Sequence, residues 1–479
     1  MKSFFLIIGS IIFVSYGSSQ PIETLQDYIN IAKSNSPRAK LAQTKKEISQ
    51  YQFQTFISDL RPQISFYGNV PAYSKDFFNV VQPDGTIKFL PRKQNLPNIG
   101  FSLSQHLLST GGLISLRSDI SRFDDFILKT KSYNSTPIYL RLDQPLFGFN
   151  QLKWNKKIEP LKVVEADRSE IFEMQKIAFD ICKDYFEVLE AQTKYEIAQS
   201  NIINLKELSE IEQKRVLLGT TSEDKILQLQ LQSIQAKQRA NQAKYDVQIT
   251  LLKLNTDAGI KNNQLVQLTI PEPSQFLSVN LDSAIHYAKI LRPEFIAFQR
   301  TSMESERDVL RAQADKKQVN LSASFGYNNA ANNFGELYSN ILNQQRLSIG
   351  FDVPIVDWGR RDARYNTAKA IQKLNQYTNE LDEQTYIQEI TTVVNTLDLL
   401  RSNIITAKET STIADNRYML SSQQYQSGKL NLTELNIAQQ ENNQADLNYI
   451  QALKAYWSSY YQLRQLTLFD FDLGSEIKK

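Results

Sequence analysis

The stretch "LRLDQPLFGFN", residues 140–150, reads as a β-strand that ends in a proline corner. Apolar and polar residues alternate up to Pro145, and proline cannot continue the hydrogen-bond ladder of a strand. A second copy, "IGFDVPIVDWG", occupies residues 349–359, and there Pro354 takes the place of Pro145. The two copies lie 209 positions apart. The chain is therefore predicted to consist of two similar halves.

The repeat extends well beyond this corner. Residues 25–37 match residues 281–293 at an offset of 256, whereas Gly219 and Gly428 keep the offset of 209. The 47 residues by which the offsets differ must be an insertion in the first half. Inside it, two alternating segments flank a Gly-Gly pair, which predicts an extra β-hairpin at about 98–120.

Each half shows one order of elements: a helix of about 35 residues, two strands, the proline corner and a long helical hairpin. Apolar residues recur at spacings of three and four, as in Ile171, Met174 and Ala178. The segment from Trp154 to Leu217 would make a rod of roughly 95 Å. Glycines near positions 219 and 428 are predicted to end the rods, because glycine adopts the left-handed conformation readily.

The N-terminus has the pattern of a secretory signal peptide, with one Lys, a short apolar run and small residues before Gln20. An uncleaved membrane anchor is the alternative. The predicted organisation is listed in chain order: signal peptide 1–19, first repeat 20–275, second repeat 276–468 and a short C-terminal tail 469–479.

Composition gives no indication of an enzyme or a nucleic-acid-binding protein. The net charge is +3, and the only cysteine, Cys182, sits in an apolar helical pattern that predicts a small buried residue. The only histidines, His106 and His286, are far apart in the sequence, and no metal, nucleophile or phosphate-loop motif is present. We therefore expect no catalytic residue, no metal and no cofactor.

The strands point to a membrane. Each half supplies two principal strands of about ten residues, so one chain has four main strands and a sheet with two open edges. Ten alternating residues suit an outer-membrane strand, and three chains could close a barrel of twelve strands. The insertion is expected to project outside the cell or to cap the mouth of that barrel.

The sequence resembles the TolC family of outer-membrane efflux proteins. The resemblance rests on the paired A-K-x-x-x-P starts at 32–37 and 288–293, the corner "PIVDWGRRDARYNTAKA" (354–370), and the turns "LLGTTSEDKIL" (217–227) and "QYQSGKLNLTEL" (424–435). It implies a mainly α fold with a small β part, in which antiparallel helical hairpins of a homotrimer form a tube continuous with a twelve-stranded outer-membrane β-barrel. It also implies a passive duct that extends into the periplasm and works with a periplasmic adaptor (membrane fusion) protein and an inner-membrane transporter.

The resemblance also assigns roles to the glycine turns. Tyr425 stands where the family has its gate tyrosine, and Glu434 stands where an acid is common; three copies would make an anionic ring. Asp224, Lys225 and Lys429 are the further candidates for the closing ion pairs. The alternative is that Tyr425 caps a helix end and that the acids complement the positive N-termini of the returning helices.

The remaining candidates have structural roles. Four residues are assigned to the tip turns and to adaptor docking: Gly219, Thr220, Gly428 and Leu430. Three residues are assigned to the corners between barrel and tube: Pro145, Pro354 and Gly359.

Two other functions fit parts of the pattern. The same tube could serve as the outer-membrane duct of a type I protein secretion system. A soluble periplasmic coiled-coil adaptor or scaffold is the alternative from a different class, although adaptors have one helical hairpin and this chain has two.

Overall fold

The computed structural model describes residues 24–146, 148–261, 266–273, 275–315, 318–339, 341–352 and 356–478, so the predicted signal peptide lies outside the described residues. The chain forms two compact units. The first contains the residues up to Ala42, Glu173–Ala284 and Ile390 onward; the second contains Gln43–Phe172 and Ile285–Glu389. Each unit draws on both sequence repeats, because the longest helices run through both units.

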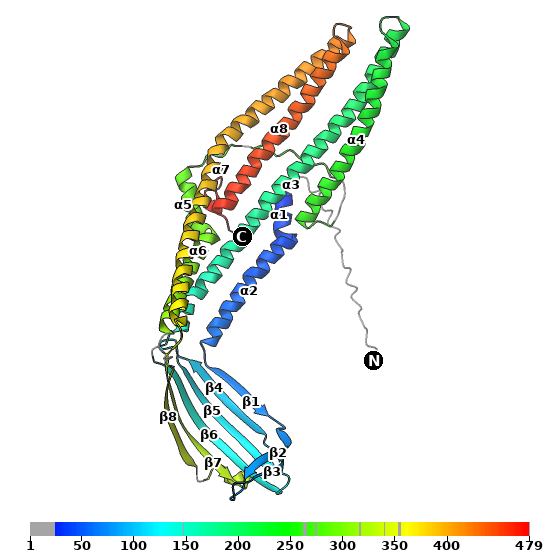
Figure 1. Ribbon diagram of the computed structural model, residues 1–479. Helices are drawn as coiled ribbons and strands as arrows, with labels where there is room; N and C mark the ends of the chain where they lie inside the picture. The colour runs from blue at the N-terminus through cyan, green and yellow to red at the C-terminus, as the bar shows by residue number, and fades with distance from the viewer. Residues whose placement is uncertain are drawn as a thin grey trace, which may run out of the picture. The chain divides into compact units, whose positions relative to one another are not determined.

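The helical hairpins repeat with the same lengths in both halves. Helices α3 (Gln151–Leu217) and α7 (Arg360–Gln426) each have 67 residues. Their partners α4 (Glu223–Ala258) and α8 (Leu432–Thr467) each have 36 residues (Figure 1). The predicted internal repeat and the mainly helical fold are confirmed. None of the described helices is both long and apolar enough to cross a membrane.

The single helix of about 35 residues expected at the start of each half is wrong. The chain forms two helices there in each case, listed in order: α1 (Leu25–Asn35) and α2 (Pro37–Asp59), then α5 (Leu281–Leu291) and α6 (Pro293–Ala314). The breaks fall at Ser36 and Arg292, whose ψ angles of 147° and 141° are extended. Each precedes a proline, whose ring clashes with a helical conformation of the preceding residue.

The core of the first unit is rich in aromatic residues. Tyr185 and Phe186 of α3 are fully buried, and Cys182 is buried beside them as predicted, where burial raises the pKa of its thiol. The segment after α4 lies across this core. Tyr185 Oη donates to the carbonyl of Thr269 (2.7 Å), and Trp457 Nε1 donates to the carbonyl of Pro271 (2.7 Å).

Removing the Tyr185 hydroxyl should lower the free energy of unfolding modestly. Tyr185→Phe leaves the buried ring in place and removes one hydrogen bond, so we expect a loss of about 1 kcal/mol. Chemical denaturation of the purified protein measures this. The matched control is Tyr195→Phe, whose hydroxyl accepts a hydrogen bond on an exposed helix face. An equal loss in both variants would mean that the link to Thr269 contributes nothing specific.

The second unit contains one antiparallel sheet. Its strands are β1 (Gln63–Asn69), β2 (Tyr73–Val81), β3 (Ile87–Asn95), β4 (Asn98–His106), β5 (Leu113–Asp125), β6 (Thr130–Pro145), β7 (Gln318–Ala331) and β8 (Leu342–Asp352). The hydrogen-bonded order is β1-β4-β5-β6-β7-β8, with β2 and β3 forming a hairpin that pairs with the end of β5 (Figure 1).

This order places strands of the insertion among the four main strands that were expected per chain. The four expected strands are β1, β6, β7 and β8, but the predicted extra hairpin, β4 and β5, is inserted between β1 and β6. Alternation of apolar and polar residues shows which face of a sheet each side chain occupies, but any strand with that alternation can pair with any other. The sequence pattern therefore did not determine where the β4–β5 hairpin lies in the sheet.

The turns of the insertion lie at both ends of the sheet. The turn at Gly111 lies beside the start of α3, where Asn150 Nδ2 donates to the carbonyl of Leu108 (2.9 Å) and Gln144 Nε2 donates to that of Thr110 (3.1 Å). The β2–β3 hairpin and the turn between β5 and β6 lie at the far end of the sheet (Figure 1). The expectation that the whole insertion projects outward is therefore wrong for the Gly111 turn.

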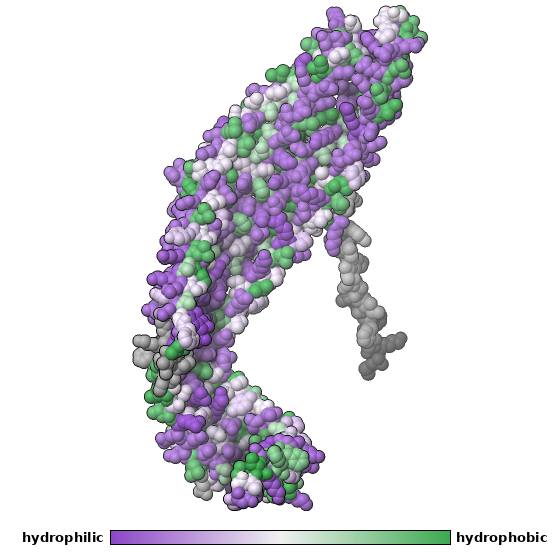
Figure 2. All heavy atoms as spheres, viewed as in Figure 1, coloured by the Kyte–Doolittle hydropathy of each residue, from purple (hydrophilic) through white to green (hydrophobic). Residues whose placement is uncertain are grey.

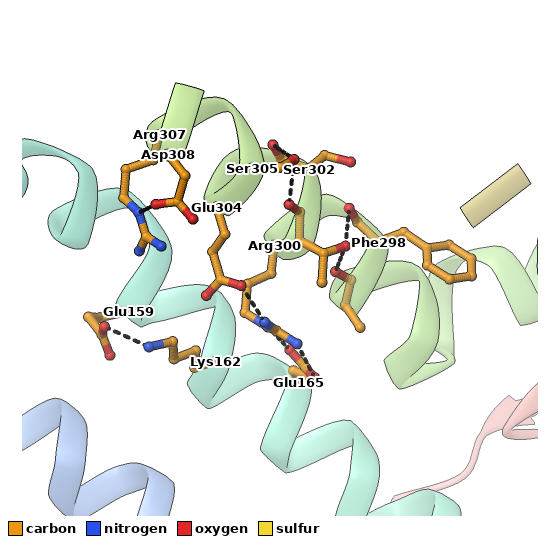
Figure 3. A network of polar contacts seen from close by, with 12 residues as sticks. Glu159, Lys162, Glu165, Phe298, Arg300, Ser302, Glu304, Ser305, Arg307 and Asp308 are labelled. Carbon is orange, nitrogen blue, oxygen red and sulfur yellow. Dashed lines mark hydrogen bonds and ion pairs between the residues drawn. The ribbon is translucent and has the colours of Figure 1, made fainter. Parts of the chain in front are cut away.

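Polar contacts fasten the helices beside this sheet. The guanidinium of Arg300 on α6 forms two hydrogen bonds with the carboxylate of Glu165 on α3, at 2.5 and 3.1 Å, and a third with Glu304 (Figure 3). Bidentate pairs of this kind fix orientation as well as distance. The remaining elements are the short helix η1 (Phe334–Glu336) and, in the first unit, the hairpin of β9 (Phe469–Asp470) and β10 (Ser475–Glu476).

Candidate functional site at the helix tips

The two helix tips have the same backbone geometry. Gly219 and Gly428 have φ angles of 70° and 77°, which glycine adopts without strain. At each tip the glycine N–H and the following N–H donate back to the last turn of the helix, at 2.8 to 3.0 Å. This is the Schellman arrangement, which satisfies the free carbonyls of a helix end. Both glycines thus occupy the turns where α3 and α7 end.

Tyr425 lies at the centre of a polar cluster that joins the two tips. Its side chain is 2% exposed, and its hydroxyl donates to Glu212 Oε1 at 2.6 Å. Arg215 donates to the same Glu212 oxygen at 2.6 Å and to the backbone carbonyl of Tyr425 at 2.7 Å. Its guanidinium also lies over the Tyr425 ring, 4.8 Å from the ring centre. We call Glu212, Arg215 and Tyr425 the tip cluster.

Apolar residues enclose the tip cluster. Leu205 and Leu208 of α3, Leu229 of α4, and Leu432 and Leu435 of α8 pack around Tyr425. The cluster therefore links the end of α3 to the end of α7 in a site from which water is largely excluded.

The surroundings shift the protonation of the cluster. Burial raises the pKa of the Tyr425 hydroxyl, and the adjacent Glu212 carboxylate raises it further. Burial opposes the charge of Glu212, but the hydrogen bonds from Tyr425 and Arg215 outweigh it and hold the pKa of this carboxyl below its ordinary value. Tyr425 is therefore a neutral donor and Glu212 a charged acceptor at neutral pH.

The other sequence candidates lie outside this cluster. Asp224, Lys225, Lys429 and Glu434 are exposed, and none of them forms an ion pair with another described residue. Asp224 and Glu434 lie in the first turns of α4 and α8, where a negative charge complements the helix dipole. Asp224 and Glu434 thus lie at the starts of the returning helices, whereas Tyr425 is buried.

The tip-turn residues have local contacts. The hydroxyl of Thr220 donates to the carbonyl of Arg215 at 3.0 Å, and Leu430 packs against the apolar residues around Tyr425. At the corners, Pro145 ends β6 and Gly359 precedes α7 with a φ angle of 80°. Pro354 lies outside the described residues.

Sequence reasoning missed Glu212 and Arg215. They stand seven and four positions before Gly219, spaced i, i+3, so that they share one helix face. That spacing near a helix end was visible in the sequence. It was not distinctive among many similar acid–base pairs, and the second repeat has Ser421 and Gln424 at the equivalent positions.

Acid should weaken the tip cluster. Because the pKa of Glu212 is lower in the folded protein than in the unfolded chain, its stabilising contribution is present above the unfolded value and is lost as the pH falls through the folded value. We expect the conductance of the reconstituted protein to rise only below pH 4.5, the ordinary value for this group. Glu212→Gln should lack this step, and a rise well above pH 4.5 in the unchanged protein would contradict the assignment.

Comparison with known proteins agrees with the geometry. The family model described as outer membrane efflux protein matches residues 297–467. No curated protein matches the sequence. Among solved structures, the CmeC outer membrane channel of Campylobacter jejuni has 15% identity and a TM-score of 0.68, with 95% of this chain and 87% of that chain covered.

Two further channels have the same fold. The outer membrane protein VceC of Vibrio cholerae has 13% identity and a TM-score of 0.63, with 95% of this chain and 97% of that chain covered. The MtrE channel of Neisseria gonorrhoeae, in its open state, has 15% identity and a TM-score of 0.63, with 95% and 89% covered.

The part of the chain at residues 297–467 is similar to the outer membrane efflux protein family, and the structural matches show that the chain has the fold of the solved channels. The resemblance to the TolC family is confirmed. Proteins of this family are located in the outer membrane. The sequence had predicted a channel protein and not an enzyme, in agreement with this family.

Proposed function

We propose that the protein is the outer-membrane duct of a tripartite efflux system, a homotrimer that conducts solutes without chemistry of its own. The observation that carries this proposal is the two-faced sheet. One face presents Ile64, Phe66 and Leu347 to the surroundings, and the other is lined by serine, arginine and aspartate. An apolar outer face and a polar inner face are what a barrel wall needs between lipid and a water-filled lumen.

The open edges of the sheet favour an oligomer. Among the described strands, β1 and β8 each have one side without a partner, and unpaired backbone groups cannot be left in lipid. A soluble adaptor or scaffold has no use for such a sheet. The type I secretion duct remains the alternative within the same fold, and accumulation of small dyes in a deletion strain distinguishes efflux from protein export.

We propose that an adaptor docks at the helical tips and in a groove that lies along the same hairpins, back from the tips. A groove of about 580 Å³ is lined by α3, α4 and α8, with glutamine and asparagine prominent among its residues, including Gln232, Gln439 and Asn443. Such side chains offer both donors and acceptors to a helical partner. Gly219, Thr220, Gly428 and Leu430 lie at the tips of the same hairpins.

Light scattering tests the oligomeric channel. The mature protein extracted from outer membranes should have three times the mass of one chain, and it should need detergent to stay in solution. A monomer or dimer that is soluble in plain buffer would overturn the proposal and favour the scaffold.

A further inference from the structure

The insertion changes the size of the barrel. The strands β1, β4, β5, β6, β7 and β8 are each antiparallel to the next, so their directions alternate. Because the number of these strands is even, the free edge of β1 in one copy meets the free edge of β8 in another copy in an antiparallel sense. The sheet can therefore close through copies of itself without a parallel seam.

All six strands have the same two faces. The register places one apolar row across five of them, and the row is listed from the edge inward: Ile64, Leu103, Leu116, Leu140 and Phe325. The reverse face carries a row of polar residues in the same strands: Gln63, Ser104, Ser115, Arg141, Ser324 and Arg346. The inserted strands β4 and β5 thus have the same alternation as the strands of the original repeat and belong to the same wall.

Exposure shows where neighbours are missing. Within the apolar row, Leu103 and Leu140 on inner strands are 37% and 40% exposed, whereas Ile64 on the edge strand β1 is 78% exposed. On the opposite edge, Leu347 of β8 is 73% exposed, whereas the most exposed apolar side chain on this face of the inner strands, Phe101, is 60% exposed. Both edges therefore present the same face with room for a further strand.

We propose that the trimer closes as a barrel of eighteen strands, six from each chain, in which β1 of each copy pairs with β8 of the next. This proposal rests on the trimeric channel of the proposed function. It replaces the twelve strands that four per chain would give. The partner is a second copy of this chain, and the site is the pair of free strand edges.

The perimeter of such a barrel fits the helices beside it. Four helical segments of each chain lie in the unit that holds the sheet: α2, the first part of α3, α6 with the end of α5 that precedes it, and the first part of α7. Twelve helices packed about 9 Å apart make a ring of roughly 110 Å. Eighteen strands about 4.8 Å apart and tilted by about 40° also make roughly 110 Å, whereas twelve make only about 75 Å. The wider barrel has a backbone diameter of about 35 Å and leaves an aqueous channel, as in large porins.

Two sets of cysteine pairs test the proposal. The first set joins neighbouring chains and combines Ser65→Cys on β1 with Arg346→Cys, Ser348→Cys or Gly350→Cys on β8. These three positions lie on the same polar face of the sheet as Ser65. Oxidation in outer membranes should give a ladder that ends at a covalent trimer. The second set lies within one chain, with Ser65→Cys/Ser102→Cys and Ile64→Cys/Leu103→Cys. These are adjacent opposed pairs of β1 and β4, so one of them has the closer spacing that a disulfide prefers.

The outcomes separate this proposal from the proposed function. Disulfides within the chain together with a covalent trimer support eighteen strands; Ser65→Cys/Ser324→Cys, on strands that do not pair, is the control and should stay reduced. A covalent trimer without either disulfide within the chain would overturn eighteen strands and leave a narrower trimeric barrel. Absence of any covalent link between chains would overturn the trimeric duct itself.

Discussion

Glu212→Ala should shift the closed tip toward the open state by at least tenfold. The substitution removes the acceptor shared by Tyr425 and Arg215 and leaves the arginine charge without its partner. Removing one member of a buried ion pair costs about 3–5 kcal/mol. Because the Arg215 side chain is 23% exposed, water recovers part of this loss. A remaining cost of roughly 2 kcal/mol corresponds to a factor of about 30 in the equilibrium between the two states.

Single-channel recording in planar bilayers measures the effect. We expect larger conductance and a greater open fraction for Glu212→Ala than for the unchanged protein, and a smaller increase for Tyr425→Phe, which removes one hydrogen bond. Glu210→Ala is the matched control, since it removes the same charge from an exposed position two residues away. Equal conductance of Glu212→Ala and Glu210→Ala would show that the tip cluster does not hold the tip closed.

The helical part of the fold could be predicted from the sequence because its signals are local. The spacing of apolar residues defined the long helices, and Gly219 and Gly428 marked their ends; the same glycines form the Schellman turns. The breaks at Ser36 and Arg292 were also visible, because Pro37 and Pro293 follow them. They were missed because the apolar periodicity continues across each break and suggested a single helix.

The sheet was harder to predict because pairing is not local. Alternation shows which face a residue occupies, and it correctly indicated a hairpin at Gly111, but it does not say which strand lies beside which. The β2–β3 hairpin was overlooked altogether, although Pro83, Asp84 and Gly85 form a typical turn sequence between its strands. The tip cluster was only partly found, since Tyr425 and Glu212 are 213 positions apart and meet only in the fold.

Leu103→Arg and Ser104→Arg should have very different effects, although they are neighbours on β4. Leu103 lies on the apolar face of the sheet and Ser104 on the polar face. If the apolar face contacts lipid, an arginine near the middle of the bilayer costs about 2–4 kcal/mol, whereas an arginine in a water-filled lumen costs little. The Leu103 variant should therefore lose most of its folded trimer, and the Ser104 variant should retain it.

The measurement is the amount of heat-resistant trimer in outer membranes, which electrophoresis separates from the unfolded chain, for each of the two variants. The pair is informative because β4 belongs to the insertion: a cost confined to Leu103→Arg requires that this inserted strand lie in the wall between lipid and lumen. Equal and small effects of both substitutions would place β4 in water on both faces, since water accommodates arginine on either side. The sheet would then have to meet lipid through the four strands of the repeat alone, and the two additional strands could not belong to the barrel.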